Sequence, residues 1–164
     1  DVFLFSETVS NNIRFGMDDA SDELVTSAAK QASIHQEIEQ FRDGYNSMIG
    51  ERGVTLSGGQ KQRISIARAL IKNPRIVIFD DCLSAVDART EKEIIQNLYQ
   101  YLADKTAIII THRIFSLLAF DKIIVIDDGR IVEQGTHGQL LEMKGYYAGM
   151  YARQQEQERE KQAV

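Results

Sequence analysis

The chain contains Leu56-Ser57-Gly58-Gly59-Gln60 and, some twenty residues later, Ile76-Val77-Ile78-Phe79-Asp80-Asp81. The first places two glycines directly after a serine that can cap a helix, and the second ends an apolar strand in two carboxylates. Free N–H groups at a helix start bind phosphate, and carboxylate oxygens bind Mg²⁺. The pair therefore indicates a nucleotide site, although no Gly-x-x-x-x-Gly-Lys-Ser/Thr loop occurs in the sequence.

The composition is that of a compact globular segment. The chain has 164 residues, of which 43% are hydrophobic and 26% charged, and a formal net charge of −5. Cys82 is the single cysteine, which excludes an internal disulfide and favours a reducing, cytosolic compartment. No apolar run approaches the roughly 20 residues of a membrane-spanning helix. The acidic balance also argues against a nucleic-acid partner, and the basic cluster Lys61, Arg63 and Arg68 follows the glycine turn.

The N-terminal part of the sequence is predicted to be mostly helical. A helix is expected over residues 21–32, and the capping-box pattern Ser33-x-x-Gln36 predicts the start of another, which Gly44 ends. A second capping box, Ser57-x-x-Gln60, predicts a helix that Pro74 stops. This helix therefore begins inside the glycine motif.

Beyond residue 75 the pattern alternates between strand and helix. The runs 76–79 and 107–110 are continuously apolar, which is typical of parallel strands buried on both faces of a sheet. A strand, an Asp-Gly turn and a returning strand over 123–132 predict a β-hairpin at a sheet edge. The polar stretch 154–162 has no apolar face and is expected to fray or be disordered.

Two interpretations of the glycine motif are open. In the first, Ser57 is simply a helix cap and the glycines permit a tight entry into the helix. In the second, the helix N-terminus binds a phosphate and the Ser57 hydroxyl donates to a phosphate oxygen. The two roles are compatible, but they compete for Ser57.

The carboxylates Asp80 and Asp81 also have two interpretations. They could mark a strand that simply enters a polar turn, or they could bind a ligand at the carboxyl edge of a parallel sheet, where α/β proteins place their sites. The second interpretation is favoured because Ser84-Ala85-Val86-Asp87 follows directly and because the next apolar strand ends in Thr111-His112. Asp80 is then a ligand of hydrated Mg²⁺, and Asp81 faces the reacting phosphate.

In this order and spacing the motifs closely resemble the ATP-binding-cassette family over the whole chain except its polar tail. By this resemblance the cofactor-binding signature motif consists of Leu56, Ser57, Gly58, Gly59 and Gln60. The Walker B strand is 76–80, the D-loop runs from Ser84 to Asp87, with these two residues also binding the cofactor, and His112 is the switch histidine. The ligands implied are ATP and Mg²⁺, with Asp80 on the metal and Asp81 and His112 as catalytic residues.

The resemblance implies an incomplete α/β domain. We expect the segment after the Q-loop at 1–5, a helical signature subdomain at 6–74, the C-terminal part of a RecA-like P-loop NTPase core at 75–153, with parallel strands and an edge β-hairpin, and a polar tail at 154–164. The A-loop aromatic, the Walker A lysine and the Q-loop glutamine of the family are absent from the sequence. We therefore expect this chain alone to bind ATP weakly or not at all, and its uncovered apolar strands suggest self-association as a hypothesis.

The family pairs two nucleotide-binding domains head to tail, with each ATP between Walker A and B of one domain and the signature motif of the other. Most hydrolysing members carry a glutamate where this sequence has Asp81, so we expect slow hydrolysis at that site. This resembles the degenerate half of a heterodimeric multidrug or lipid exporter, and it implies a different partner subunit that carries a Glu base. Met48 to Gly53 resemble the X-loop of exporters, which implies that Glu51 contacts the transmembrane domain and that the protein lies at the cytoplasmic face of the inner or plasma membrane.

Three other interpretations compete with an exporter. A cohesin-like or DNA-repair ATPase would emerge from a long coiled coil and lack the context of His112. A translation-associated ATPase of the same superfamily has no transmembrane partner, and Gly50-Glu51-Arg52-Gly53 argues against it. The third is a degenerate ATP-dependent clamp that binds and dimerises with negligible hydrolysis. Turnover at the Asp81 site, measured with the partner's base disabled, separates a clamp from a slow enzyme.

Overall fold

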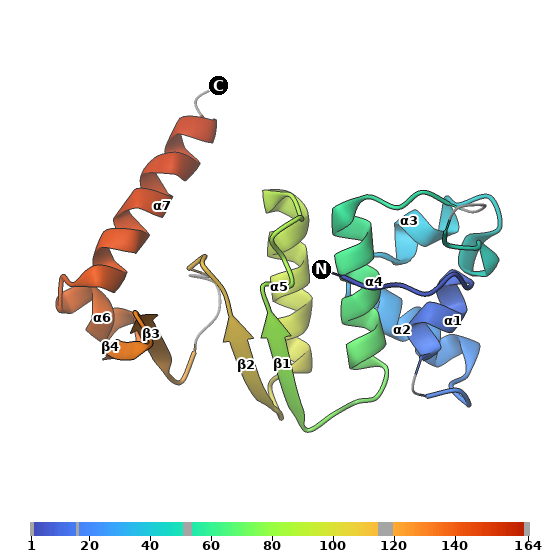
Figure 1. Ribbon diagram of the computed structural model, residues 1–164, viewed down its shortest axis with the longest axis horizontal. Helices are drawn as coiled ribbons and strands as arrows, with labels where there is room; N and C mark the ends of the chain where they lie inside the picture. The colour runs from blue at the N-terminus through green and yellow to red at the C-terminus, as the bar shows by residue number, and fades with distance from the viewer. Residues whose placement is uncertain (1, 16, 51–53, 115–119, 163–164) are drawn as a thin grey trace. The chain divides into compact units, whose positions relative to one another are not determined.

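The computed structural model describes residues 2–15, 17–50, 54–114 and 120–162 (Figure 1). It divides into two compact units, Asp1–Ile110 and Thr111–Val164. We call them the first and the second unit. The predicted boundary between residues 74 and 75 does not coincide with this division and stays a prediction.

The first unit begins with short helices, as the sequence predicts. They are α1 (Val9–Arg14), α2 (Asp22–Gln31), α3 (His35–Glu39), the 3₁₀ turn η1 (Gly44–Asn46) and α4 (Gly58–Leu70). The helix expected over 21–32 is confirmed, because the Ser21 side chain caps α2 by accepting a hydrogen bond from the Leu24 N–H. Helix α4 contacts both α1 and α2, and its inner face contributes Ile64, Ala67 and Leu70 to the core.

The capping box predicted at Ser33 is wrong. Helix α3 begins at His35 after Ile34, which makes no side-chain cap, and it ends at Glu39, well before Gly44. Ser33 has a positive φ of 53°, and its hydroxyl accepts a hydrogen bond from the Asn97 amide at 3.0 Å. The tertiary contact with Asn97 therefore competes successfully with local capping.

The parallel strands expected from the apolar runs are present. Strand β1 (Ile76–Asp80) pairs in parallel with β2 (Thr106–Ile110), and α5 (Ala88–Tyr101) connects them. Figure 1 shows α5 running along the paired strands. The helix buries Ile94, Ile95 and Leu98, which are spaced to share one side of a helix.

The prediction that these strands are buried on both faces is wrong. In β1, Val77 and Phe79 are buried, whereas Ile76 and Ile78 are 63% and 62% exposed. Ile78 pairs with Ile108 in β2, which is exposed too, and Ile110 pairs with Asp80. One face of the strand pair is thus apolar and open, and Asp80 lies on that face at its carboxyl end.

The second unit contains the expected β-hairpin. Strands β3 (Ile123–Asp127) and β4 (Arg130–Gly135) pair antiparallel, followed by α6 (His137–Glu142) and α7 (Tyr146–Gln162). Asp128 and Gly129 both have positive φ, 45° and 70°, as a tight hairpin turn of Asp-Gly requires. Ile114, Leu140 and Tyr147 form a small core.

The end of the chain differs from the expectation of disorder. Helix α7 continues through the polar stretch to Gln162. Gln, Glu, Arg and Lys, which make up this stretch, all have high helix propensity, so an apolar face is not required for a helical conformation. None of the helices in the described ranges combines the length and the apolar character needed to cross a membrane.

Candidate functional site

The glycine motif forms a complete capping box at the start of α4. Ser57 is the N-cap residue, and its Oγ accepts a hydrogen bond from the Gln60 N–H at 3.2 Å. The Gln60 Oε1 in turn accepts from the Ser57 N–H at 2.9 Å. Since Ser57 Oγ acts as acceptor in this cap and is on an exposed residue, its own proton can still be donated to a ligand. The capping interpretation of the sequence is confirmed, while phosphate binding stays a prediction.

The other residues of the motif have packing roles. Leu56 is buried in the core. A Cβ at Gly58 would lie 3.3 Å from the Ala85 Cβ, and one at Gly59 would lie 2.9 Å from the Ala85 carbonyl oxygen. The glycines therefore allow the first turn of α4 to approach the segment from Ser84 to Asp87, in addition to any approach of a phosphate.

The side chain of Gln60 is held from a second direction by Glu37. The Gln60 Nε2 donates to Glu37 Oε2 at 2.9 Å, and Arg63 Nη1 donates to Glu37 Oε1 at 2.5 Å. Burial would raise the pKa of Glu37, but the hydrogen bonds from Arg63 and Gln60 and the charge of Arg63 outweigh it, so the pKa lies below its ordinary value. The ionised carboxylate thus links α3 to the glycine motif at neutral pH.

The basic residues beside the motif are mostly engaged within the chain. Arg63 is buried and, besides Glu37, donates to the Ser33 carbonyl. Arg68 donates to the backbone oxygens of Asn12 and Phe3 and lies over the Phe5 ring, 5.4 Å from its centroid. These two cations stabilise the helical part of the first unit and are not free to bind a phosphate.

The two carboxylates lie at the carboxyl end of β1, as predicted. Asp80 is the last residue of the strand, and the Asp81 N–H continues the ladder by donating to the Ile110 carbonyl at 2.9 Å. Both residues are exposed. Asp81 has a positive φ of 46°, a conformation that aspartate adopts more readily than most residues. The strand end therefore turns sharply at Asp81.

The thiol of the neighbouring Cys82 is not in its reactive, ionised form. Burial raises the pKa of its thiol to about 11, and the charges of Asp81 and Asp80 act in the same direction. The thiol is therefore protonated at neutral pH, and we assign it no chemistry.

The segment from Ser84 to Asp87 joins the strand to α5. The Asp87 Oδ1 accepts a hydrogen bond from the Thr90 N–H at 3.0 Å, which caps the first turn of α5. Ser84 Oγ donates to the Asp81 carbonyl at 3.1 Å. The structure thus brings this segment together with the glycine motif and with Asp81 inside the first unit. Gln62, which binds Ser84 and Ala85, is a member of this cluster that sequence reasoning missed.

Two predicted site residues cannot be related to this cluster from the structure. His112 is exposed and belongs to the second unit, so its relation to Asp81 stays a prediction. Glu51, with Arg52 and Gly53, lies outside the described residues. The proposed contact of Glu51 therefore also stays a prediction.

The described residues do not form a protein cage for a metal ion. Within those ranges no group of three or more His, Cys, Asp or Glu side chains could hold one. Mg²⁺ in nucleotide sites is usually held by one or two carboxylates together with phosphate oxygens and water. The exposed Asp80 carboxylate fits such a site, in which the nucleotide supplies most of the ligands.

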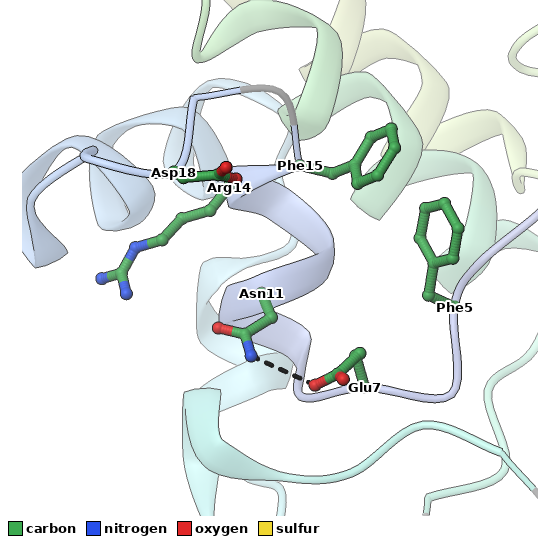
Figure 2. Close-up of a pocket in the computed structure, with 6 residues that line it drawn as sticks. All are labelled: Phe5, Glu7, Asn11, Arg14, Phe15 and Asp18. Atoms are coloured by element: carbon green, nitrogen blue, oxygen red, sulfur yellow. Dashed lines mark hydrogen bonds between the residues drawn. The ribbon is translucent and has the colours of Figure 1, made fainter.

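A surface pocket lies elsewhere in the first unit. Figure 2 shows its lining residues, with the Asn11 amide donating to the Glu7 carboxylate at 3.1 Å. The Phe5 and Phe15 rings approach within 4.5 Å between centroids and form its apolar side. None of the predicted site residues lines this pocket, and we assign it no function.

The chain is similar to known proteins over most of its length. A family model described as "ABC transporter" matches residues 1–84. The chain is 52% identical over 149 residues to the uncharacterized ABC transporter ATP-binding protein YknU of Bacillus subtilis, covering 91% of this chain and 26% of that protein. It is 46% identical over 155 residues to ATP-binding cassette sub-family B member 6 of Xenopus tropicalis, covering 94% of this chain and 18% of that protein.

A solved structure has the same fold. It is that of a bacterial Atm1-family ABC exporter with ATP bound, which matches with a TM-score of 0.85 and 45% identity. The match covers 94% of this chain and 27% of the exporter chain. The chain therefore spans only about a quarter, or less, of the length of these relatives.

Proposed function

Because the chain belongs to the ABC transporter family, as part of a nucleotide-binding domain of exporter type, we propose that it contributes to two ATP sites of a paired exporter. The observation that carries this proposal is the exposed Asp80 at the carboxyl end of β1, in the same unit as an exposed helix cap at Ser57. In the proposed head-to-tail pair, Asp80 serves one ATP and Ser57 serves the other.

The proposed chemistry is ATP hydrolysis coupled to transport. Asp80 holds the Mg²⁺ that accompanies ATP, and the ion neutralises charge on the phosphates. Asp81 accepts a proton from, or orients, the attacking water, and His112 offers an imidazole that can hydrogen-bond the reacting phosphate. On the other site, Ser57, Gly58 and Gly59 present a hydroxyl and backbone N–H groups to the phosphates of an ATP held by the partner.

The proposed partners are a second nucleotide-binding domain and a transmembrane domain. The side chain of Asp81 is one methylene shorter than that of glutamate. This difference supports pairing with a different subunit that carries a glutamate at this position. Contact with the transmembrane domain is proposed near Glu51, at the cytoplasmic face of the inner or plasma membrane. The chain alone lacks a Walker A loop in its sequence, and we propose that it does not hydrolyse ATP by itself.

A degenerate clamp is the second candidate, and the short side chain of Asp81 favours it. In a clamp, ATP binding closes the pair and this site does not turn over. Residual hydrolysis in a complete transporter whose partner base is disabled would indicate a slow enzyme, and its absence a clamp.

Replacing Ser57 by alanine tests the proposed role of the glycine motif. In a complete transporter that carries Asp81→Asn, so that only the partner's base works, we expect Ser57→Ala to lower turnover about tenfold through loss of a hydroxyl that donates to phosphate. Ser21→Ala is the matched control, since it removes the serine cap of α2 at a similar cost of about 1 kcal/mol. Equal turnover in the two variants would contradict a phosphate contact at Ser57.

A further inference from the structure

The side chain of Gln62 forms a polar link between α4 and the turn after β1. Gln62 is only 7% exposed and lies one helical turn beyond Gly58 and Gly59, on the same side of α4. Its Nε2 donates to Ser84 Oγ at 3.0 Å, and its Oε1 accepts from the Ala85 N–H at 3.0 Å. Both ends of a buried amide are therefore satisfied by the same turn.

The same turn is also fixed to the carboxyl end of β1. Ser84 Oγ accepts the Gln62 hydrogen bond and donates one of its own to the Asp81 carbonyl at 3.1 Å. The Gln62 Nε2 also lies 3.5 Å from that carbonyl oxygen. A continuous set of hydrogen bonds therefore joins the Asp81 carbonyl to α4, and a buried amide that lost its partners would remain unsatisfied.

We propose that Gln62 is a positioning residue that couples the two ATP sites through this chain. The inference rests on the proposed function, in which Asp81 serves one ATP and the N-terminus of α4 serves the other. In this proposal Gln62 contacts neither nucleotide. It fixes the position of the glycine motif relative to the turn from Asp81 to Asp87. Gly59 belongs to the same contact, since a Cβ there would lie 2.9 Å from the Ala85 carbonyl oxygen.

The coupling is tested by Gln62→Met, which conserves side-chain length and removes both hydrogen bonds. In a complete transporter carrying Asp81→Asn, we expect Gln62→Met to lower kcat at the partner's site about tenfold with less than a twofold change in KM for ATP. Gln62→Glu, which keeps the acceptor for the Ala85 N–H, should retain part of this turnover. Gln96→Met, the same change at an exposed position of α5, is the control and should leave kcat unchanged.

A second measurement separates this inference from the proposed function. In this chain, hydrogen exchange at the Ala85 amide should become about tenfold faster in Gln62→Met and remain unchanged in Gln96→Met. Faster exchange with unaltered kcat would overturn the coupling while leaving the proposed function intact. Unaltered exchange would overturn the contact itself, and a complete wild-type transporter without any ATP hydrolysis would instead refute the proposed function and the coupling with it.

Discussion

Replacing Asp81 by glutamate is expected to raise ATP turnover in a complete transporter, by up to about 100-fold at the site that contains this residue. Glutamate is one methylene longer, and a displacement of about 1 Å in a catalytic group can change a rate by this factor. The Asp81 backbone is fixed by its hydrogen bond to the Ile110 carbonyl, and the residue is exposed. The longer side chain can therefore extend toward the reacting phosphate without a clash in the core.

The measurement is steady-state hydrolysis with the partner's base disabled, so that only the Asp81 site contributes. Asp128→Glu is a matched control, because Asp128 has almost the same positive φ, 45° against 46°, in the hairpin turn of the second unit. It reports whether placing glutamate at such a positive φ, which aspartate tolerates better, by itself changes turnover, and we expect no increase. If Asp81→Glu left turnover unchanged, side-chain length would not limit this site.

Replacing Gly59 by alanine is expected to destabilise the chain by about 2 kcal/mol. The new Cβ would lie 2.9 Å from the Ala85 carbonyl oxygen and 3.7 Å from the Val86 Cα. Both neighbours are backbone atoms, which cannot rotate away as a side chain can. The clash should exceed the gain in helix propensity of up to about 1 kcal/mol that alanine offers over glycine.

Urea unfolding of the chain measures this change. Gly138→Ala provides the control, since Gly138 also lies near the start of a helix, α6, and a Cβ there would meet no atom within 4 Å. We expect Gly138→Ala to be neutral or slightly stabilising. A Gly59→Ala variant as stable as this control would mean that the packing of α4 against Ala85 is not close in solution.

The sequence predicts local structure well where no tertiary contact competes with the local pattern. Ser33 and Ser57 both begin a Ser-x-x-Gln pattern, yet only Ser57 forms the capping box. Ser33 instead receives the Asn97 amide from α5, a contact between distant parts of the chain that no local pattern contains. The parallel pairing of β1 and β2 was predictable from their apolar runs, whereas the exposure of Ile76 and Ile78 depends on what packs against the sheet.

The residues of the candidate site could likewise be predicted only in part from the sequence. The sequence correctly placed Ser57 at a helix start and Asp80 and Asp81 at a strand end, while their roles in a site stay a prediction. Gln62 was missed, since a glutamine within a helix carries no signal until its partners in the turn after β1 are known. The positive φ of Asp81 likewise could not be seen in the sequence, although aspartate is one of the residues that tolerate it.

We propose that the motifs of this chain belong to two different ATP molecules and hold neither of them alone. The most direct test is calorimetric titration of magnesium ATP, at millimolar concentration, into the 164-residue chain. We predict no saturable heat of binding, because Asp80 supplies a single carboxylate and the glycine motif lacks the rest of the site. Clear saturable binding would contradict this assignment, since the two motifs would then hold a nucleotide without a lysine loop or a partner.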